Sequence, residues 1–137
     1  MSKFLLKVLS VTHWTDTLFS FQIERPKDFK FKSGEFVMIG LPNSEKPILR
    51  AYSICSPSWD ERLEFYSIIV ENGPLTSKLK NIKINDEIIL MSKSTGTLIL
   101  DALKPAKRLF LFSTGTGFAP FSSIIRDPET YDKFEKI

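Results

Sequence analysis

The chain has 137 residues, of which 42% are hydrophobic and 26% charged, which is enough for one ordinary domain core and too few for two complete ones. Its 19 basic and 16 acidic residues leave a net charge of +3, well below the charge of a dedicated nucleic-acid-binding domain. The composition therefore excludes two full domains and argues against a nucleic-acid partner.

The N-terminal residues predict a first strand. Lys7 interrupts the apolar run and no small-residue cleavage site follows, so the segment does not fit a signal peptide. No stretch reaches the roughly 20 apolar residues of a membrane-spanning helix, and we expect a soluble protein without a membrane partner. A single cysteine, Cys55, excludes an internal disulfide and fits a reducing compartment, the cytoplasm.

Six short segments rich in β-branched and aromatic residues predict strands. They are residues 4–11, 17–23, 36–41, 51–56, 63–70 and 87–91. In the second segment Phe19, Phe21 and Ile23 fall on one face, which is the two-residue period of a half-buried strand. Closing the strands removes exposed edges. The sequence therefore predicts an all-β N-terminal domain, a six-stranded antiparallel Greek-key barrel.

One short helix at residues 75–80 interrupts the strands, entered through a turn at Asn72, Gly73 and Pro74. After residue 91 the pattern changes to an apolar strand at 108–112, a glycine turn, a helix at 119–126 and a second helix opened by Asp127 and Pro128. This β-α-α order is typical of the beginning of a parallel α/β sheet. We place the domain boundary near residues 103–106, which divides residues 1–103 from residues 104–137.

The stretch RAYS combines a cation, an aromatic ring and a hydroxyl on one predicted strand, at Arg50, Ala51, Tyr52 and Ser53. A guanidinium offers a planar fork to phosphate oxygens, and an aromatic face stacks on a flat ring. These side chains fit a ligand that has both phosphate and a ring system. The alternative is an ordinary strand with Arg50 and Tyr52 at a barrel rim.

The stretch GPLTS, residues 73–77, places Thr76 and Ser77 in the first turn of the predicted helix. Unpaired amides, the positive end of the helix dipole and two hydroxyls together favour an anion such as phosphate. The alternative is that Thr76 or Ser77 only caps the helix.

The stretch STGTGFAPF, residues 113–121, follows the apolar run RLFLF and predicts a strand, a glycine turn and a helix. Gly115 and Gly117 allow close approach of the backbone to a ligand. No Gly-Lys-Ser/Thr follows, so this is not a Walker loop, and Pro120 stands where the dinucleotide fingerprint has its third glycine. A nucleotide loop and a plain strand-to-helix turn are both open.

The histidine, the cysteine and several lysines have no pattern that indicates a catalytic or metal site. His13 has no second candidate ligand nearby in sequence, so we expect no metal site. Cys55 is expected to pack as a small hydrophobe. A set of lysines fits either solvated positions or a diffuse basic face towards an acidic partner, namely Lys78, Lys80, Lys83 and Lys93.

A resemblance to the bacterial type of ferredoxin (flavodoxin)–NADP reductase, a FAD enzyme, rests on four segments in this order. They are RAYSICSPSWDERLEFYSI, ENGPLTSKL, KSTGTLILDAL and STGTGFAPFSSIIRDPE. The resemblance covers residues 4–137. It implies a six-stranded antiparallel barrel that holds FAD, followed by a parallel α/β domain that binds NADPH as co-substrate.

For the matching positions the resemblance implies specific roles. Arg50 would bind the FAD pyrophosphate, Tyr52 would stack against the flavin, and Ser53 would hydrogen-bond near the reactive N5. Tyr52 and Ser53 are therefore the implied catalytic residues, and Thr116 would lie where nicotinamide meets flavin. The other implied cofactor-binding residues are Ala51, Tyr66, Ser67, Ile68, Gly73, Pro74, Leu75, Thr76 and Ser77.

The family continues for nearly as long again beyond Ile137, so we expect this chain to be a fragment. It would lack further parallel strands, the residues that recognise the NADP 2′-phosphate and the segment that covers the flavin. The strand at 108–112 would have no neighbour in its own chain, and about thirty C-terminal residues would be poorly stabilised unless they fold back on the barrel.

The implied activity is electron transfer between NADPH and ferredoxin or flavodoxin, through hydride transfer at flavin N5 and single-electron steps. One alternative is a FAD-binding domain without NADPH activity. Another is a flavin reductase or the reductase component of an oxygenase, although no cysteine cluster for an iron–sulfur centre is present. A barrel that binds single-stranded nucleic acid is disfavoured because strand alternation buries most of the phenylalanines.

Overall fold

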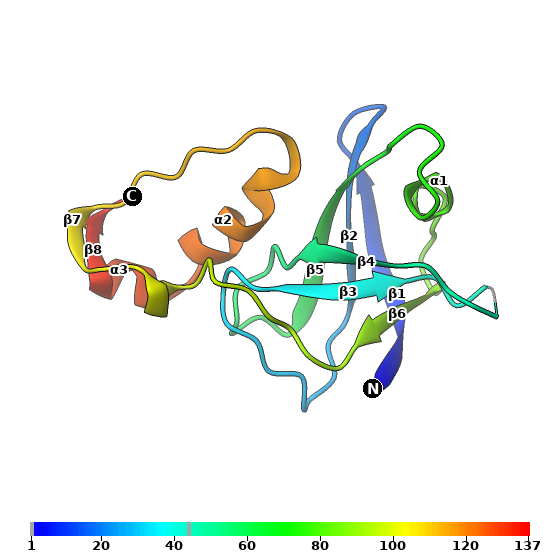
Figure 1. Cartoon of the computed structure of the whole chain (residues 1–137), viewed down its shortest axis with the longest axis horizontal. Helices are drawn as coiled ribbons and strands as arrows, with labels where there is room; N and C mark the ends of the chain where they lie inside the picture. The colour runs from blue at the N-terminus through cyan, green and yellow to red at the C-terminus, as the bar shows by residue number, and fades with distance from the viewer. Residues whose placement is uncertain (1, 44) are drawn as a thin grey trace.

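The computed structural model describes residues 2–43 and 45–137. A six-stranded antiparallel sheet has the spatial order β4-β3-β6-β1-β2-β5. Figure 1 shows these strands wrapped into a barrel, with α2, α3 and the C-terminus beside it. The strands are β1 (Lys3–His13), β2 (Leu18–Glu24), β3 (Phe36–Gly40), β4 (Leu49–Ser53), β5 (Arg62–Ile68) and β6 (Glu87–Met91). The predicted all-β barrel is confirmed, with shifted strand ends.

Strand β1 joins the two halves of the sheet. Its first part, from Lys3 to Lys7, pairs with β6, and its second part pairs with β2. The register shifts between Val8 and Ser10, and such an irregularity bends a strand and increases its twist. One strand therefore contributes to both curved halves of the barrel.

Strands β4 and β5 close the barrel at a short seam. Ile54 forms an isolated antiparallel bridge with Phe65, and the amide of Cys55 donates to the carbonyl of Glu64 at 2.8 Å. The side chains that fill the interior come mainly from alternate positions of the strands. On β2 they are Phe19, Phe21 and Ile23, each at most 1% exposed, as the two-residue period predicts.

Helix α1 (Thr76–Leu79) is a single turn between β5 and β6, inside the predicted segment. Leu75 and Leu79 are buried and attach this turn to the barrel. In Figure 1, α1 lies to the right of strand β5 and α2 to its left. The barrel therefore has helical segments on both sides of the β4–β5 seam.

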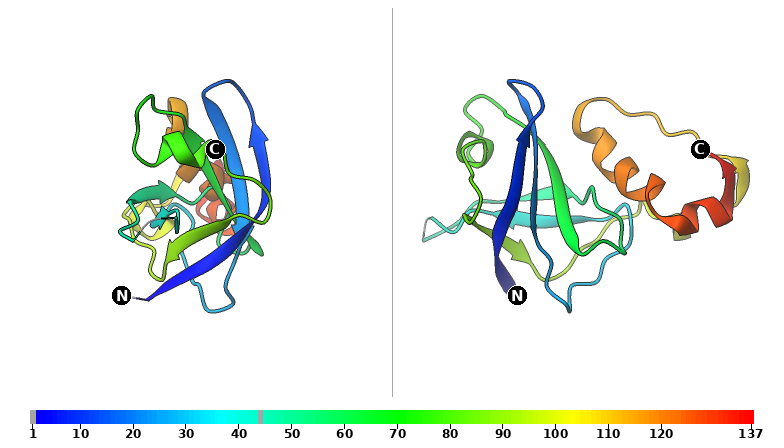
Figure 2. Two further views of the ribbon diagram at one scale, coloured as in Figure 1. Left: turned by 90° about the vertical axis from the view of Figure 1, so that its right-hand side faces the viewer. Right: turned by 180° about the vertical axis from the view of Figure 1, so that it is seen from behind.

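The C-terminal part contains η1 (Leu100–Ala102), β7 (Ala106–Arg108), η2 (Gly115–Gly117), α2 (Phe118–Ile125), α3 (Pro128–Lys133) and β8 (Phe134–Lys136). Asp127 caps α3 by accepting a hydrogen bond from the amide of Glu129 at 3.0 Å, with Pro128 at the helix start. The two predicted helices are thus confirmed. Figure 2 shows from behind that this part extends from one side of the barrel, with α2 nearest to it.

The predicted strand at residues 108–112 is wrong. Strand β7 ends at Arg108, and its pairing with β8 reaches only to the amide of Leu109, which donates to Lys136 at 2.9 Å. Strand β8 has only three residues, so within the described part of the chain no hydrogen-bonding partner extends along the rest of the apolar run. Phe110 and Phe112 are consequently 67% and 85% exposed and stack on each other.

The expectation that this strand has no neighbour in its own chain is also wrong. Strands β7 and β8 pair in parallel, with Ala106 opposite Phe134. A second small core forms from Leu100, Ile124 and Phe134, and α2 packs on the barrel. The C-terminal part therefore contacts the barrel through Ser123, Arg126 and Asp127, and β7 and β8 lie further from the barrel. Across the described residues, none of the helices has both the length and the apolar character needed to cross a membrane.

Candidate functional site

A cavity of about 290 Å³ lies between β4, β5, α1 and the beginning of α2. Its lining comes from four stretches that are distant in sequence. The lining residues are Arg50, Ala51, Tyr52, Ser53, Tyr66, Ser67, Ile68, Val70, Thr76, Thr116 and Ala119. The structure thus brings together the RAYS stretch, its neighbouring strand, one residue of GPLTS and one residue of the glycine turn.

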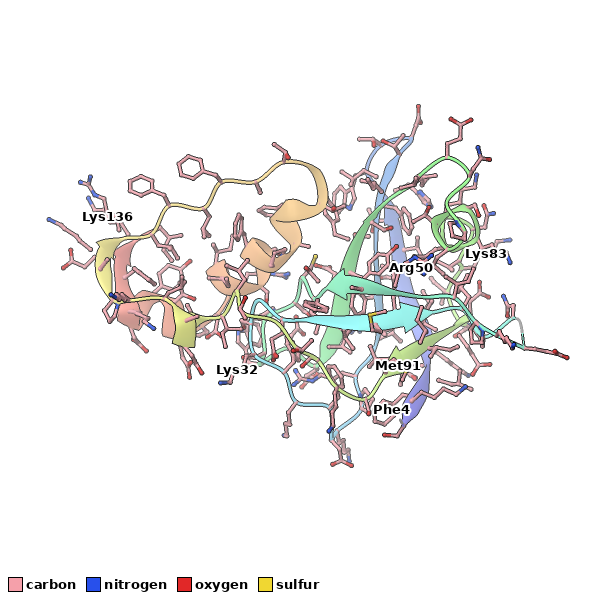
Figure 3. The ribbon with its side chains drawn as sticks, in the orientation of Figure 1. Phe4, Lys32, Arg50, Lys83, Met91 and Lys136 are labelled. Carbon is pink, nitrogen blue, oxygen red and sulfur yellow. The ribbon has the colours of Figure 1, made fainter. Side chains whose placement is uncertain are left out.

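The β4 wall presents Arg50 to solvent. Strand β4 pairs with β3 along its length, with Tyr52 opposite Val37 and Ser53 opposite Phe36. Arg50 is exposed, and its guanidinium donates to the carbonyl of Leu49 at 2.9 Å. Figure 3 shows Arg50 beside the turn of α1. The guanidinium therefore has room to bind a phosphate group at the cavity edge.

Tyr52 connects this wall to β5. Its hydroxyl lies 3.0 Å from the Ser67 hydroxyl, and its ring contacts Phe65 edge-on, with ring centroids 6.4 Å apart. Burial raises the pKa of the Tyr52 phenol, and the hydrogen bond with Ser67 opposes this only in part. The phenol therefore remains neutral at neutral pH and presents a half-buried aromatic surface at the cavity.

Three consecutive residues of β5 line the cavity. Ser67 is buried, and its hydroxyl also donates to the carbonyl of Ile68 at 3.3 Å. Tyr66 is half-buried and Ile68 is 42% exposed. The wall thus combines hydroxyl groups with an aromatic and an aliphatic surface, a mixture typical of sites for amphipathic ligands.

Thr76 is the only GPLTS residue in this cavity, among the residues that the structure describes. Its hydroxyl accepts from the amide of Val70 and donates to the carbonyl of Val70, both at 3.2 Å. This pair of bonds fixes the loop between β5 and α1. Within the described chain no side chain caps the helix at Leu75, so the interpretation of Thr76 or Ser77 as a helix cap is wrong.

The remaining GPLTS residues lie outside this cavity. Pro74 and Leu75 line a separate cavity of about 30 Å³, and Ser77 lines another of about 530 Å³ together with Asn81 and Asp86. Gly73 lines none of the cavities described here. The fold therefore separates Thr76 from its neighbours, because successive residues of a helical turn point in different directions.

The glycine turn forms the third side of the cavity. Gly115 has a φ of +55°, and a side-chain carbon placed there would meet nothing within 4 Å. Thr116 follows it and is half-buried against the cavity. The positive φ at Gly115 turns the chain from the exposed apolar run into α2.

Two lining residues are not in the sequence-based set. Ala119 lies three residues after Thr116, about one helical turn, so helical spacing from the glycine turn is a signal that indicates it. Val70 follows β5 and has no comparable signal. Its place in the cavity results from the Thr76 hydrogen bonds.

The cavity is suited to binding and orienting a ligand. Its described lining includes one cation, several hydroxyls and two tyrosine rings, and among these lining residues there is no carboxylate, histidine or cysteine. General acid–base or nucleophilic catalysis by the side chains is therefore not the chemistry that the lining supports. A cationic fork beside aromatic surfaces fits a ligand with a diphosphate and a flat ring system.

Comparison with known proteins identifies a family. The family model described as "Oxidoreductase FAD-binding domain" matches residues 4–98. The chain is 61% identical over 131 residues to the flavodoxin/ferredoxin–NADP reductase of Rhodobacter capsulatus, covering 95% of this chain and 48% of the relative. It is 56% identical over 131 residues to the ferredoxin–NADP reductase of Pseudomonas aeruginosa, covering 96% and 51%. The chain thus spans about half the length of the curated relatives it matches.

Solved structures agree on the fold. A ferredoxin NADP+ reductase from Neisseria gonorrhoeae with bound FAD and NADP superposes with a TM-score of 0.92 at 33% identity, covering 97% of this chain and 54% of that one. Phthalate dioxygenase reductase superposes with a TM-score of 0.79 at 22% identity, covering 98% and 42%. The second similarity shows a shared fold.

Proposed function

Because the chain belongs to the oxidoreductase FAD-binding domain family, we propose that the cavity between β4 and β5 holds FAD. The observation that carries this proposal is the meeting of Arg50, Tyr52 and Thr116 at one cavity, although they come from separate stretches. Arg50 supplies the charge for a diphosphate, and Tyr52 supplies a neutral ring for a flavin.

Each of these residues has a proposed role. Arg50 binds the pyrophosphate, and Ala51 in the same strand lines the site. Tyr52 stacks against the flavin ring system, and Ser53 hydrogen-bonds near its N5 position, so Tyr52 and Ser53 are the residues that orient the reactive part. The bound FAD supplies the hydride and single-electron chemistry, and these side chains bind and orient it.

Further contacts are proposed around the cofactor. Tyr66, Ser67 and Ile68 line it along β5, and Thr116 lies where a nicotinamide would meet the flavin. The segment that leads into α1, residues 73–77, is the proposed phosphate-binding segment. Thr76 is the member of that segment whose place in the cavity supports this role.

We propose that the chain is part of a ferredoxin–NADP reductase that transfers electrons between NADPH and ferredoxin or flavodoxin, in the cytoplasm. The names of the curated relatives support this activity. In this proposal residues 1–103 are the FAD-binding unit, and residues 104–137 begin an NADP-binding unit. The glycine turn, the two helices and the parallel β7–β8 pair support the second assignment.

A second candidate is a FAD-binding unit without NADPH activity. The family model matches only residues 4–98, and the chain spans about half of its relatives. In this reading the chain holds the flavin through the barrel, and residues 104–137 do not suffice for a productive NADPH site.

The test is to saturate the purified chain with FAD, remove free cofactor by desalting, and identify the extracted flavin. Yellow protein that releases FAD supports the proposal, and colourless folded protein contradicts it. Anaerobic addition of NADPH then separates the two candidates. Bleaching of the flavin absorbance supports the reductase, and an unchanged spectrum supports the FAD-binding unit alone.

A further inference from the structure

Helix α2 presents one face to the barrel seam and the cavity. Its buried residues at the helical spacing are Ala119, Ser122 and Ser123. Ala119, near the beginning of the helix, lines the cavity. Ser123, about one turn further along, is fully buried, and its hydroxyl donates to the carbonyl of Ser56 at 2.8 Å and accepts from the amide of Gly34 at 3.3 Å.

Arg126 follows α2 and bonds to both sides of the seam. Its guanidinium donates to the carbonyl of Cys55 and, at 3.3 Å, to the carboxylate of Glu64. Cys55 and Glu64 are themselves paired where β4 and β5 close the barrel. The same guanidinium donates to the hydroxyl and the carbonyl of Ser122, at 2.9 and 3.1 Å. Arg126 therefore connects the helix to the point of closure.

The beginning of α2 contacts the cavity wall through Thr116 and the buried Ala119, whereas the side-chain hydrogen bonds of α2 to the barrel come from Ser123 and from Arg126 after its end. Gly115 has open space around it, and Phe118 is 46% exposed. Within the described residues no side chain caps this helix at Gly117. Helix α2 has 8 residues and is therefore only about 12 Å long, so attachment of its last turn restricts where its first turn lies.

We propose that Ser123 and Arg126, together called the anchor pair, are positioning residues that hold Thr116 and Ala119 against the β4–β5 wall of the cavity. The inference rests on the proposed function where it concerns FAD. The anchor pair attaches α2 to the carbonyls of Ser56 and Cys55. These residues lie three and two positions after Ser53, the last residue of β4. Displacement of α2 therefore widens the cavity on the side where Thr116 lies.

Docking of α2 and binding of FAD should be thermodynamically coupled. If docking of α2 shapes the site for FAD, then bound FAD must strengthen the docking of α2 by the same factor. A residue that only contributes to global stability has no such reciprocal effect on a cavity contact.

Trp59 provides a reporter of docking that does not require FAD. Its indole N–H donates to the carbonyl of Arg126 at 2.9 Å, although the side chain is 62% exposed. The chain has two tryptophans, so a Trp14→Phe background leaves Trp59 as the single source of indole emission. Ser123→Ala removes both hydroxyl bonds. Arg126→Lys keeps the charge but lacks the fork that reaches several acceptors at once.

Without FAD, we expect both variants to shift the Trp59 emission towards that of a fully hydrated indole. Two matched controls should leave it unchanged. Tyr131→Phe removes a bond from α3 to the carbonyl of Ile125 but none to the barrel, and Ile88→Val lowers stability from the core of β6. Unshifted emission in both anchor variants, or equal shifts in the controls, would overturn the inference.

With FAD, we expect the anchor variants to raise the dissociation constant about tenfold, because Ser123→Ala loses two buried hydrogen bonds and Arg126→Lys loses part-buried ones. FAD at saturation should return the wavelength of the Trp59 emission maximum in Arg126→Lys to that of the wild type. Wild-type affinity in both variants would overturn the inference. Failure of the wild-type chain to bind FAD contradicts the proposed function instead, and the emission of the FAD-free variants still decides whether the anchor pair docks α2.

Discussion

The hydroxyl of Tyr52 lies 3.0 Å from the hydroxyl of Ser67, so a side-chain hydrogen bond connects β4 to β5 beside the seam of the barrel. The bond fixes the Tyr52 ring edge-on to Phe65 at the cavity wall. A ring held in this way has lost its rotational freedom before a ligand arrives, which lowers the cost of stacking.

Replacing Tyr52 tests the stacking role. We expect Tyr52→Ala to weaken FAD binding about tenfold, since stacking of a base on an aromatic side chain contributes about 1–3 kcal/mol. It should also change the visible absorption of bound FAD. Tyr52→Phe keeps the ring but loses the hydrogen bond to Ser67, so its affinity should lie between those of the wild type and Tyr52→Ala. Titration of each variant with FAD, followed by absorbance, measures both effects. Wild-type affinity and absorption of Tyr52→Ala would show that Tyr52 does not stack on the flavin.

Arg50 provides the corresponding test for the diphosphate. We expect Arg50→Ala to weaken FAD binding at least about tenfold, because a charge-assisted bond to phosphate is lost, and to leave the melting temperature unchanged because the side chain is exposed. The matched control is Arg62→Ala, an exposed arginine on β5 that donates to Gln22 and lies outside the cavity lining. If the two substitutions weaken FAD binding equally, the net charge of the protein, and not the position of Arg50, determines the affinity.

We expect the buried Cys55 thiol to make the fold less stable at alkaline pH. Burial raises the pKa of the Cys55 thiol from 9.0 to about 12, with Glu64 adding to the rise and Arg126 opposing it. Because the unfolded thiol ionises first, the free energy of unfolding should fall as pH rises from 9.0 towards about 12, by up to about 1.4 kcal/mol per pH unit.

Urea unfolding at a series of alkaline pH values measures this loss. Cys55→Ala lacks the thiol, so its free energy of unfolding should fall less steeply over the same interval. The comparison uses slopes, because the substitution also changes packing at every pH. Parallel slopes for the two proteins would show that the thiol does not contribute.

Two glycines with positive φ should respond very differently to alanine. At Gly34 (φ +103°) an added carbon would lie 1.8 Å from the carbonyl oxygen of Leu98, whereas at Gly115 (φ +55°) it meets nothing within 4 Å. We expect Gly34→Ala to lower the free energy of unfolding by more than about 4 kcal/mol. Gly115→Ala should lower it by about 1–2 kcal/mol. Chemical denaturation distinguishes these values, and similar losses would contradict the close approach at Gly34.

Much of the barrel is predictable because strand alternation depends on neighbouring residues. Phe19, Phe21 and Ile23 are buried on one face of β2, as their spacing predicts. The meeting of RAYS with Tyr66 and Thr116 is different, because no local pattern says which strands close the barrel. The family resemblance supplied that information, and the roles of these residues in binding FAD stay predictions.

The sequence-based predictions fail where contacts between residues distant in sequence determine the structure. The run RLFLF has the composition of a buried strand, yet Phe110 and Phe112 are exposed because β8 pairs only as far as Leu109. Local sequence also gives no sign that Ser123 contacts Ser56. That contact joins residues 67 positions apart and depends on how α2 packs on the seam.

The most direct test of the account is calorimetric titration of FAD into the purified chain, with Arg50→Ala measured alongside. We predict a saturable heat of binding for the wild-type chain and a weaker interaction for the variant. A well-folded wild-type chain that gives no heat with FAD and no colour after desalting would contradict it.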